Sequence, residues 1–327
     1  MPVLQGVEYL ESDSAQFTIA RNGTLAYIPG SATRLNNTLA MVDRAGREEP
    51  LKAPARAYED MALSPDGRFL ALTLVSGQQW NIWLYDLQQG SLSRLTFEGD
   101  NRDPLWSTDG KHVIYASTRK GRRGIYWKAV GGSGGEEQLL ETKTQPFPTT
   151  VSADGKYLLY GVGSWEDTAA IYALPLEGER KPKELFKERG VERAMASPDG
   201  KWIAYESSES GRVEIYVRRF SGGGQRWQIS PDGGTHAVWS KDGRELYFRS
   251  TGGDSGGNLM SAMIAKNDEF TFSAARSLFR FSYAQAGHDY EVVGNGQKFI
   301  VIKVPENETK ATQVNVVLNW ASELKRK

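Results

Sequence analysis

Short apolar runs alternate with polar turns along almost the whole chain. Aliphatic, β-branched and aromatic residues gather in runs of three or four, of which five are Phe69–Leu72, Val113–Tyr115, Tyr157–Tyr160, Trp202–Tyr205 and Leu246–Phe248. A second series, each beginning with Ile followed by Tyr or Trp, comprises residues 82–85, 125–127, 171–173 and 215–217. Runs of this length and composition are typical of strands rather than helices. The pattern therefore predicts an all-β protein.

A recurring turn precedes each run of the first series. Ser64–Arg68, Ser107–Lys111, Ser152–Lys156, Ser197–Lys201 and Ser240–Arg244 share the pattern Ser-x-Asp-Gly-Lys/Arg, and weaker copies lie at Asn22-Gly23 and Asn295-Gly296. Asp or Asn caps its own backbone in such a turn, and Gly takes the left-handed conformation that closes a hairpin. The seven glycines are separated by 44, 43, 45, 45, 43 and 53 residues, a period typical of four-stranded propeller blades. Seven turns predict a seven-bladed β-propeller with four-stranded antiparallel blades.

The two ends of the chain suggest how the ring closes. The last unit, which ends in residues 314–320, contains three predicted strands, whereas the segment at about residues 2–10 resembles an outer strand without a blade of its own. A circular array leaves exposed strand edges unless its termini pair. We expect the N-terminal strand to complete the last blade, giving one domain over residues 1–327 with a tail at about 321–327. A six-bladed ring with an appendage is the alternative.

The repeated Ser-Pro-Asp-Gly-Lys turn, followed by an Ile-Tyr strand, resembles the TolB-type, WD-repeat-like propeller family over nearly the whole chain. Residues 23–30 and 316–325 also resemble the C-terminal propeller that is attached to some bacterial serine/threonine kinases. The resemblance implies a bacterial module that binds a protein or ligand, within a larger protein and often outside the cytoplasm. A periplasmic or other extracytoplasmic location is thus expected. The fold alone implies no particular reaction, because propellers host many activities.

Composition excludes several other classes of protein. Lys plus Arg and Asp plus Glu number 40 each, so no global charge favours nucleic acid as a partner. The absence of cysteine excludes disulfides, thiolate metal sites and a cysteine nucleophile. We expect no signal peptide in this chain, and it has no apolar run of about 18 residues that would predict membrane insertion. We expect a monomer that binds a peptide, a protein or a small polar ligand.

Candidate site residues follow from the register of the repeat. In a propeller, equivalent positions on the innermost strands form rings around a central channel. The position six residues before each turn Asp or Asn, together with the residue preceding it, is rich in charged side chains and contains two of the three histidines. The predicted ligand-binding residues are Glu59, Asp60, Arg102, Asp103, Glu192, Arg193, His236, His288 and Asp289. We expect them to converge at the mouth of the channel.

Two functions are compatible with such a mouth. The first is a non-catalytic recognition module for a peptide, protein or small ligand, as a sensor or interaction part of a larger protein. The second is a hydrolase of the esterase, lactonase or phosphotriesterase type, in which a divalent metal ion in the channel activates water. The metal candidates are Asp60, Asp103, His236, His288 and Asp289, and the catalytic candidates are His236, His288, Asp289 and Ser255. We rank recognition first, because no catalytic motif supports the hydrolase.

Ser255 enters that set through a short motif. Gly253-Asp254-Ser255-Gly256-Gly257 matches the residues around the nucleophile of chymotrypsin-like proteases. That motif needs its own double barrel, and a nucleophile elbow needs a strand that enters a helix, whereas this segment reads as a Gly-rich hairpin loop. A flexible connection explains it better, although the loop is predicted to emerge on the same face as His236 and His288.

Overall fold

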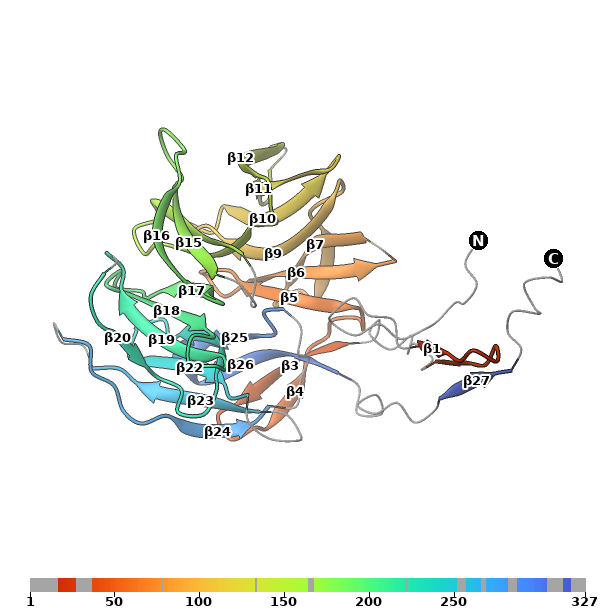
Figure 1. Cartoon of the computed structure of the whole chain (residues 1–327). Helices are drawn as coiled ribbons and strands as arrows, with labels where there is room; N and C mark the ends of the chain where they lie inside the picture. Colours follow the sequence, from red (N-terminus) through yellow and green to blue (C-terminus); the bar gives the residue numbers. More distant parts are fainter. Residues whose placement is uncertain are drawn as a thin grey trace.

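The computed structural model describes residues 17–27, 37–77, 79–132, 134–163, 168–221, 223–251, 257–265, 269–281, 287–304 and 314–318. These residues form six four-stranded antiparallel sheets and one three-stranded sheet. The six larger sheets are the blades of a propeller and are arranged around a common centre (Figure 1). The prediction of an all-β propeller with four-stranded antiparallel blades is confirmed. Within the described residues the ring has six blades, so the alternative blade number is the one observed.

The first five blades each use four consecutive strands. Blade 1 contains β5 (Tyr58–Leu63), β6 (Phe69–Ser76), β7 (Gln79–Asp86) and β8 (Ser91–Arg94), and blade 2 contains β9 (Asp100–Trp106), β10 (His112–Arg119), β11 (Arg122–Ala129) and β12 (Glu136–Thr142). Blade 3 contains β13 (Phe147–Val151), β14 (Tyr157–Val162), β15 (Thr168–Pro175) and β16 (Lys183–Arg189). Blade 4 contains β17 (Glu192–Ala196), β18 (Trp202–Ser207), β19 (Glu214–Arg219) and β20 (Arg226–Gln228). Blade 5 contains β21 (Thr235–Trp239), β22 (Glu245–Arg249), β23 (Asn258–Met263) and β24 (Arg276–Arg280).

Blade 6 is built from both ends of the chain. Its inner strands β25 (Tyr290–Val293) and β26 (Lys298–Lys303) are C-terminal, and its outer strands β3 (Thr38–Asp43) and β4 (Glu48–Pro50) are N-terminal. A short 3-10 turn (Gly294–Gly296) joins β25 to β26. Strands β26 and β3 pair over six residues, from Lys298 with Asp43 to Lys303 with Thr38. The ring therefore closes with two strands from each end, and the predicted three-plus-one closure is wrong.

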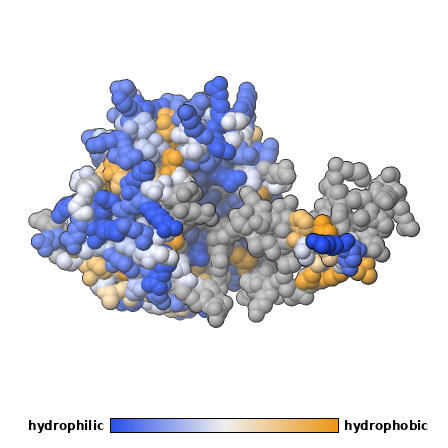
Figure 2. Space-filling view, in the orientation of Figure 1, coloured by the Kyte–Doolittle hydropathy of each residue, from blue (hydrophilic) through white to orange (hydrophobic). Residues whose placement is uncertain are grey.

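The seventh turn lies outside the ring. Asn22-Gly23 joins β1 (Phe17–Ile19) to β2 (Leu25–Tyr27), and β2 pairs with β27 (Asn315–Val317) in the three-stranded sheet. Figure 1 places this sheet beside the ring, and the exposed side chains of Phe17, Ile19 and Val316 belong to the apolar surface visible there in Figure 2. A turn motif identifies a hairpin but not the sheet that the hairpin joins. Residues 2–16 and 319–327, which include the predicted N-terminal strand and tail, lie outside the described residues.

The repeated turn has a local hydrogen-bonding explanation. In blade 4 the Ser197 hydroxyl donates to Asp199 Oδ1 at 2.6 Å and accepts the N–H of Trp202 at 2.9 Å. Asp199 Oδ1 also accepts the N–H of Lys201 at 3.1 Å, and Gly200 has a φ of +70°. The same contacts recur at the turns that begin at residues 64, 107, 152 and 240. Each turn thus closes the hairpin between the first two strands of a blade without help from the rest of the fold.

Apolar side chains between neighbouring blades form the core. One cluster joins Ala71 and Ile82 of blade 1 to Val113 and Tyr115 of blade 2. The Trp106 indole N–H donates to Ala62 O at 2.9 Å across the same boundary, which satisfies the polar end of a buried aromatic residue. Because each sheet buries both faces against its neighbours, the inner strands are held firmly around the channel.

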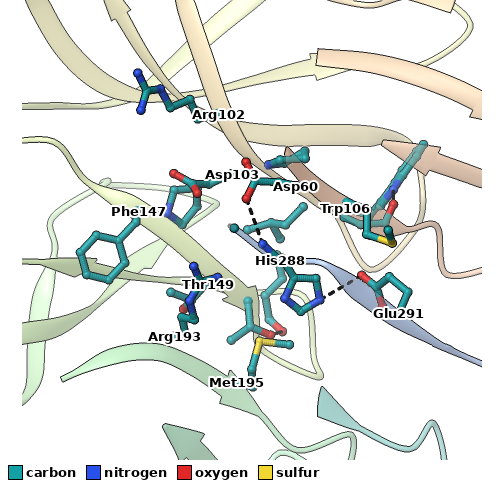
Figure 3. Close-up of a pocket in the computed structure, with 18 of the residues that line it drawn as sticks. Asp60, Arg102, Asp103, Trp106, Phe147, Thr149, Arg193, Met195, His288 and Glu291 are labelled. Carbon is teal, nitrogen blue, oxygen red and sulfur yellow. Dashed lines mark hydrogen bonds and ion pairs between the residues drawn. The ribbon is translucent and has the colours of Figure 1, made fainter. Parts of the chain in front are cut away.

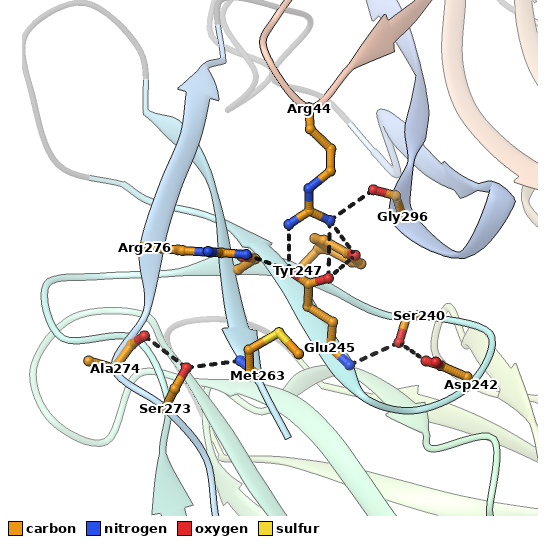
Figure 4. Close-up of polar contacts among 11 residues, drawn as sticks. Arg44, Ser240, Asp242, Glu245, Tyr247, Met263, Ser273, Ala274, Arg276 and Gly296 are labelled. Atoms are coloured by element: carbon orange, nitrogen blue, oxygen red, sulfur yellow. Dashed lines mark hydrogen bonds and ion pairs between the residues drawn. The ribbon is translucent and has the colours of Figure 1, made fainter. Parts of the chain in front are cut away.

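A charged cluster fastens blade 6 to blade 5. Arg44, in the turn between β3 and β4, donates to Glu245 Oε1 at 2.8 Å and Oε2 at 3.1 Å, and to Gly296 O at 2.9 Å. The Tyr247 hydroxyl donates to Glu245 Oε2 at 2.6 Å (Figure 4). A Cβ on Gly296 would lie 1.7 Å from the Tyr247 hydroxyl, so this position requires glycine. We call Arg44, Glu245, Tyr247 and Gly296 the closure latch, because they join the N-terminal, middle and C-terminal parts of the chain.

Candidate functional site

The inner strands of the first five blades depart from regular pairing near their beginnings. Each carries a β-bulge, located at about residues 59–60, 103–104, 149, 193–194 and 236–237. Asp103, Arg193 and His236 there have φ values of +52°, +47° and +57°, a left-handed conformation that costs a non-glycine residue about 1 kcal/mol or more. Bulges redirect side chains, and they are common beside functional sites. These lie at the positions that the repeat register had singled out.

A cavity of about 580 Å³ occupies the channel beside these bulges. Seven of the nine predicted ligand-binding residues line it, namely Glu59, Asp60, Arg102, Asp103, Glu192, Arg193 and His288. We call these seven residues the channel mouth. Leu105, Phe147 and Met195 are among the apolar residues in the wall, so the cavity combines charged groups with an apolar surface, as ligand sites commonly do.

Asp60 and His288 connect blade 1 to the segment that precedes blade 6. The backbone N–H of His288 donates to Asp60 Oδ1 at 3.0 Å, and His288 Nε2 lies 3.4 Å from Glu291 Oε1 (Figure 3). Burial by itself lowers the pKa of His288, but the hydrogen bond and charge of Glu291 outweigh burial, so that the net shift is upward. His288 is thereby favoured in its charged form.

Asp103 and Glu192 are carboxyl groups in an unfavourable environment. Burial, followed by the nearby charge of Asp60, raises the pKa of Asp103 to about 7. Burial, followed by the charge of Glu206, raises the pKa of Glu192 to about 8. Arg193 partly offsets both shifts. Such strongly shifted carboxyl groups in a cavity are typical of binding or catalytic sites.

Glu59 and Arg102 line the cavity and share a contact with Trp80. The Trp80 indole N–H donates to Glu59 Oε2 at 2.8 Å, and the Arg102 guanidinium lies 3.7 Å from the centre of the Trp80 ring. The ring therefore holds Arg102 by a cation–π contact while it fixes Glu59 by a hydrogen bond. Trp80 was not among the predicted site residues, because its strand β7 lies two strands outward from the innermost strand β5.

His236 and Asp289 do not line the cavity but lie buried behind its wall. His236 is 8% exposed, and its Nε2 contacts Gly287 O. Asp289 is fully buried and pairs with Arg249 Nη1 at 2.5 Å. Burial raises the pKa of Asp289 to about 7 and lowers that of His236 well below its usual value. These two predicted residues are therefore not part of the cavity lining, and their contact with a ligand stays a prediction.

The buried layer nevertheless contacts the channel mouth. Glu206, fully buried on β18, accepts the N–H of His236 at 2.6 Å and lies 3.8 Å from Arg193 Nε. The rings of His236 and His288 are 6.4 Å apart between centres, so the predicted proximity of these distant residues is confirmed. Glu206 was missed by the register argument, because only the innermost strands were considered. A signal was nevertheless present in the sequence, since Glu206 directly follows the apolar run 202–205, where a charged residue is unusual for a buried strand.

The metal and nucleophile hypotheses gain no geometric support from the described residues. These contain no group of three or more His, Asp or Glu side chains arranged to hold a metal ion, so the five metal candidates do not form a ligand set there. Ser255 lies outside the described residues. Within the same described residues, no helix is long and apolar enough to span a bilayer.

Comparison with known proteins places the fold. No family model matches the chain. A solved structure from Agrobacterium tumefaciens, assigned as a TolB, superposes with a TM-score of 0.65 at 20% identity, covering 82% of this chain and 98% of that one. TolB from Acinetobacter baumannii superposes with a TM-score of 0.57 at 20% identity, covering 77% and 66%. The chain has the TolB-type propeller fold. At this identity the likeness establishes architecture alone.

Sequence relatives of this TolB-type propeller agree with that fold. The chain is 34% identical over 102 residues to the Tol-Pal system protein TolB of Francisella tularensis, a stretch that covers 30% of this chain and 23% of that protein. It is 27% identical over 182 residues to an uncharacterised protein of Agrobacterium fabrum, with 50% and 56% covered. The matches thus span less than two thirds of the length of these relatives.

Proposed function

We propose that the chain is a non-catalytic recognition module that holds a peptide or protein segment at the channel mouth. The observation that carries the proposal is the cavity of about 580 Å³ in which seven register-equivalent polar residues meet an apolar wall. An extended peptide offers both the polar groups and the apolar side chains that such a surface binds. The Tol-Pal system name of one relative is consistent with a role in protein assembly.

The larger context is part of the same proposal. We place the module within a longer bacterial protein that acts outside the cytoplasm, as a sensor or interaction part. Support comes from the resemblance of both ends to kinase-attached propellers and from the greater length of the TolB relative, of which the matched stretch covers 23%. The hydrolase hypothesis has less support, because its intended acid–base residue His236 lies behind the cavity wall with Nε2 on Gly287 O.

Selection of short random peptides displayed on phage, followed by calorimetric titration of the synthesised peptides, tests the proposal. We expect selected peptides to bind the wild-type protein and to lose about tenfold or more in affinity, about 1.4 kcal/mol, with Phe147→Ala in the cavity wall. Phe272→Ala is the matched control, because Phe272 is 37% exposed and is not among the residues that line the cavity. Peptides that tolerate Phe147→Ala, or no enrichment at all, would contradict the proposal.

A further inference from the structure

Three carboxyl groups of the channel mouth have unused hydrogen-bonding capacity. Asp60 is only 5% exposed, yet its one hydrogen bond within the described residues is the His288 N–H on Oδ1. Its other oxygen is left for the cavity that Asp60 lines. The carboxyl groups of Asp103 and Glu192, which line the same cavity, have no hydrogen-bond partner in the described part of the chain. A buried carboxylate without a full set of donors is costly, unless a ligand supplies them.

The charges that line the cavity are unequal. Glu59, Asp60, Asp103, Glu192 and Glu291 face Arg102, Arg193 and His288. Arg102 is held on the Trp80 ring, and Arg193 Nε lies 3.8 Å from the buried Glu206. Neither arginine makes an ion pair of 4 Å or less with Asp60 or Asp103 within the described residues. Burial, followed by the charge of Asp60, raises the pKa of Asp103, so the two carboxyl groups repel each other when both are charged.

The apolar wall next to these carboxyl groups is closely packed against strand β14. A Cβ on Gly161 would lie 1.9 Å from the Phe147 ring, so glycine lets the ring pack directly on β14. Phe147 and Met195 both line the cavity close to Asp103 and Arg193 (Figure 3). A ligand group that reaches the carboxyl groups must therefore lie along apolar side chains and end in hydrogen-bond donors.

We propose, building on the function above, that the channel mouth receives a primary ammonium group on an apolar stem between Asp60 and Asp103. A peptide amino terminus and a lysine side chain both present this chemistry. The ammonium group supplies donors to the free oxygens, and its charge removes the repulsion between the two aspartates. A carboxylate or phosphate group would instead add to the negative charge.

Three probes of equal chain length test this preference, namely hexylammonium, hexanol and hexanoate, each titrated by calorimetry at pH 8. We expect hexylammonium to bind at least about tenfold more tightly than hexanol, a difference of about 1.4 kcal/mol, and hexanoate to bind more weakly than either. Asp60→Asn with Asp103→Asn should reduce hexylammonium binding to the level of hexanol. Glu98→Gln should leave it unchanged, since Glu98 is exposed and does not line the cavity.

The outcomes separate this inference from the proposed function. If hexanol or hexanoate equals hexylammonium, or if the double variant keeps full affinity, the ammonium preference is overturned. The recognition function would still stand if the selected peptides remain sensitive to Phe147→Ala. Acetylating the amino terminus of those peptides, or replacing their lysines by norleucine, identifies the source of the ammonium group. Peptides that tolerate both changes together would also overturn the preference.

Discussion

Two glutamates, Glu245 in the closure latch and Glu192 in the channel mouth, behave in opposite ways in this molecule, although the less exposed one is Glu245. In the closure latch, burial raises the pKa of Glu245, but the hydrogen bonds from Arg44 and Tyr247 outweigh it and the net shift is downward. In the channel mouth, burial and the charge of Glu206 raise the pKa of Glu192 to about 8. The difference lies in the donors, because Glu245 has an arginine on both oxygens and Glu192 has no hydrogen-bond donor among the described residues. Full pairing is typical of a structural site, whereas unmet pairing agrees with the ligand site that we propose for the channel mouth.

The largest expected effect is at the latch. Arg44→Met leaves Glu245, which is 8% exposed, with only the longer ion pair of 3.9 Å to Arg276, and weakens the contact between blades 5 and 6. Removing one partner of a buried pair costs about 3–5 kcal/mol, and we expect about 3 kcal/mol here because the Arg44 side chain is 26% exposed. Urea denaturation measures the free energy of unfolding. Arg47→Met is the control in the same turn, since Arg47 is 84% exposed and its ion pair is worth less than about 1 kcal/mol. If both variants lower the free energy of unfolding equally, the closure latch does not have the structural role assigned to it.

The pH dependence of stability sharpens the comparison. Folding raises the pKa of Glu192 to about 8, so the folded state holds a proton that the unfolded state releases between about pH 4.3 and pH 8. Its contribution to the free energy of unfolding is therefore complete at low pH and lost as pH rises towards 8. Glu192→Gln should flatten this part of the profile and be more stable than wild type at pH 8, by roughly 1–2 kcal/mol.

Glu245→Gln gives the opposite sign in the same measurement. The pKa of Glu245 is lowered in the folded state, so its stabilisation is present above the unfolded pKa and is lost as pH falls through the folded value. We expect the variant to be less stable than wild type at pH 8 and to approach it in acid. Unfolding curves recorded from about pH 2 to about pH 9 compare both variants, because the contribution of Glu245 is lost only below its unfolded pKa. If both variants shift the profile in the same direction, the two sites do not differ in the way described.

A smaller effect is expected from the latch hydroxyl. Tyr247→Phe removes the hydrogen bond of 2.6 Å to Glu245 Oε2 and keeps the buried ring. The loss should cost about 1 kcal/mol, measured by chemical denaturation. Tyr157→Phe is the control, because Tyr157 is 39% exposed. If Tyr247→Phe has the same free energy of unfolding as wild type, the Tyr247 hydroxyl does not contribute to the latch, and Arg44 alone stabilises Glu245.

The smallest expected change is a gain. Asp103→Asn removes the repulsion with Asp60, and asparagine tolerates the left-handed φ of +52°. We expect the variant to be more stable than wild type at pH 8 by about 1 kcal/mol or less, measured by calorimetric melting. If the variant is less stable than wild type, Asp103 has a structural partner, and its role is structural rather than ligand binding.

The sequence by itself determined the hairpins and the positions that face the channel. The turn at Ser197 to Lys201 is satisfied by hydrogen bonds within six residues, so each copy folds in the same way wherever it occurs, and equal spacing then places Asp60, Asp103 and Arg193 at equivalent points.

Only the tertiary structure decided the number of blades and the membership of the site. The sixth blade depends on pairing between β3 and β26, and the latch joins Arg44 to Glu245 across 201 residues. No local signal distinguishes the Asn22 turn, which lies outside the ring, from the Asn295 turn within it. His236 and Asp289 share the register of Asp60, but Gly287 and Arg249 cover them, because burial is set by neighbours that the chain brings together only when the ring closes.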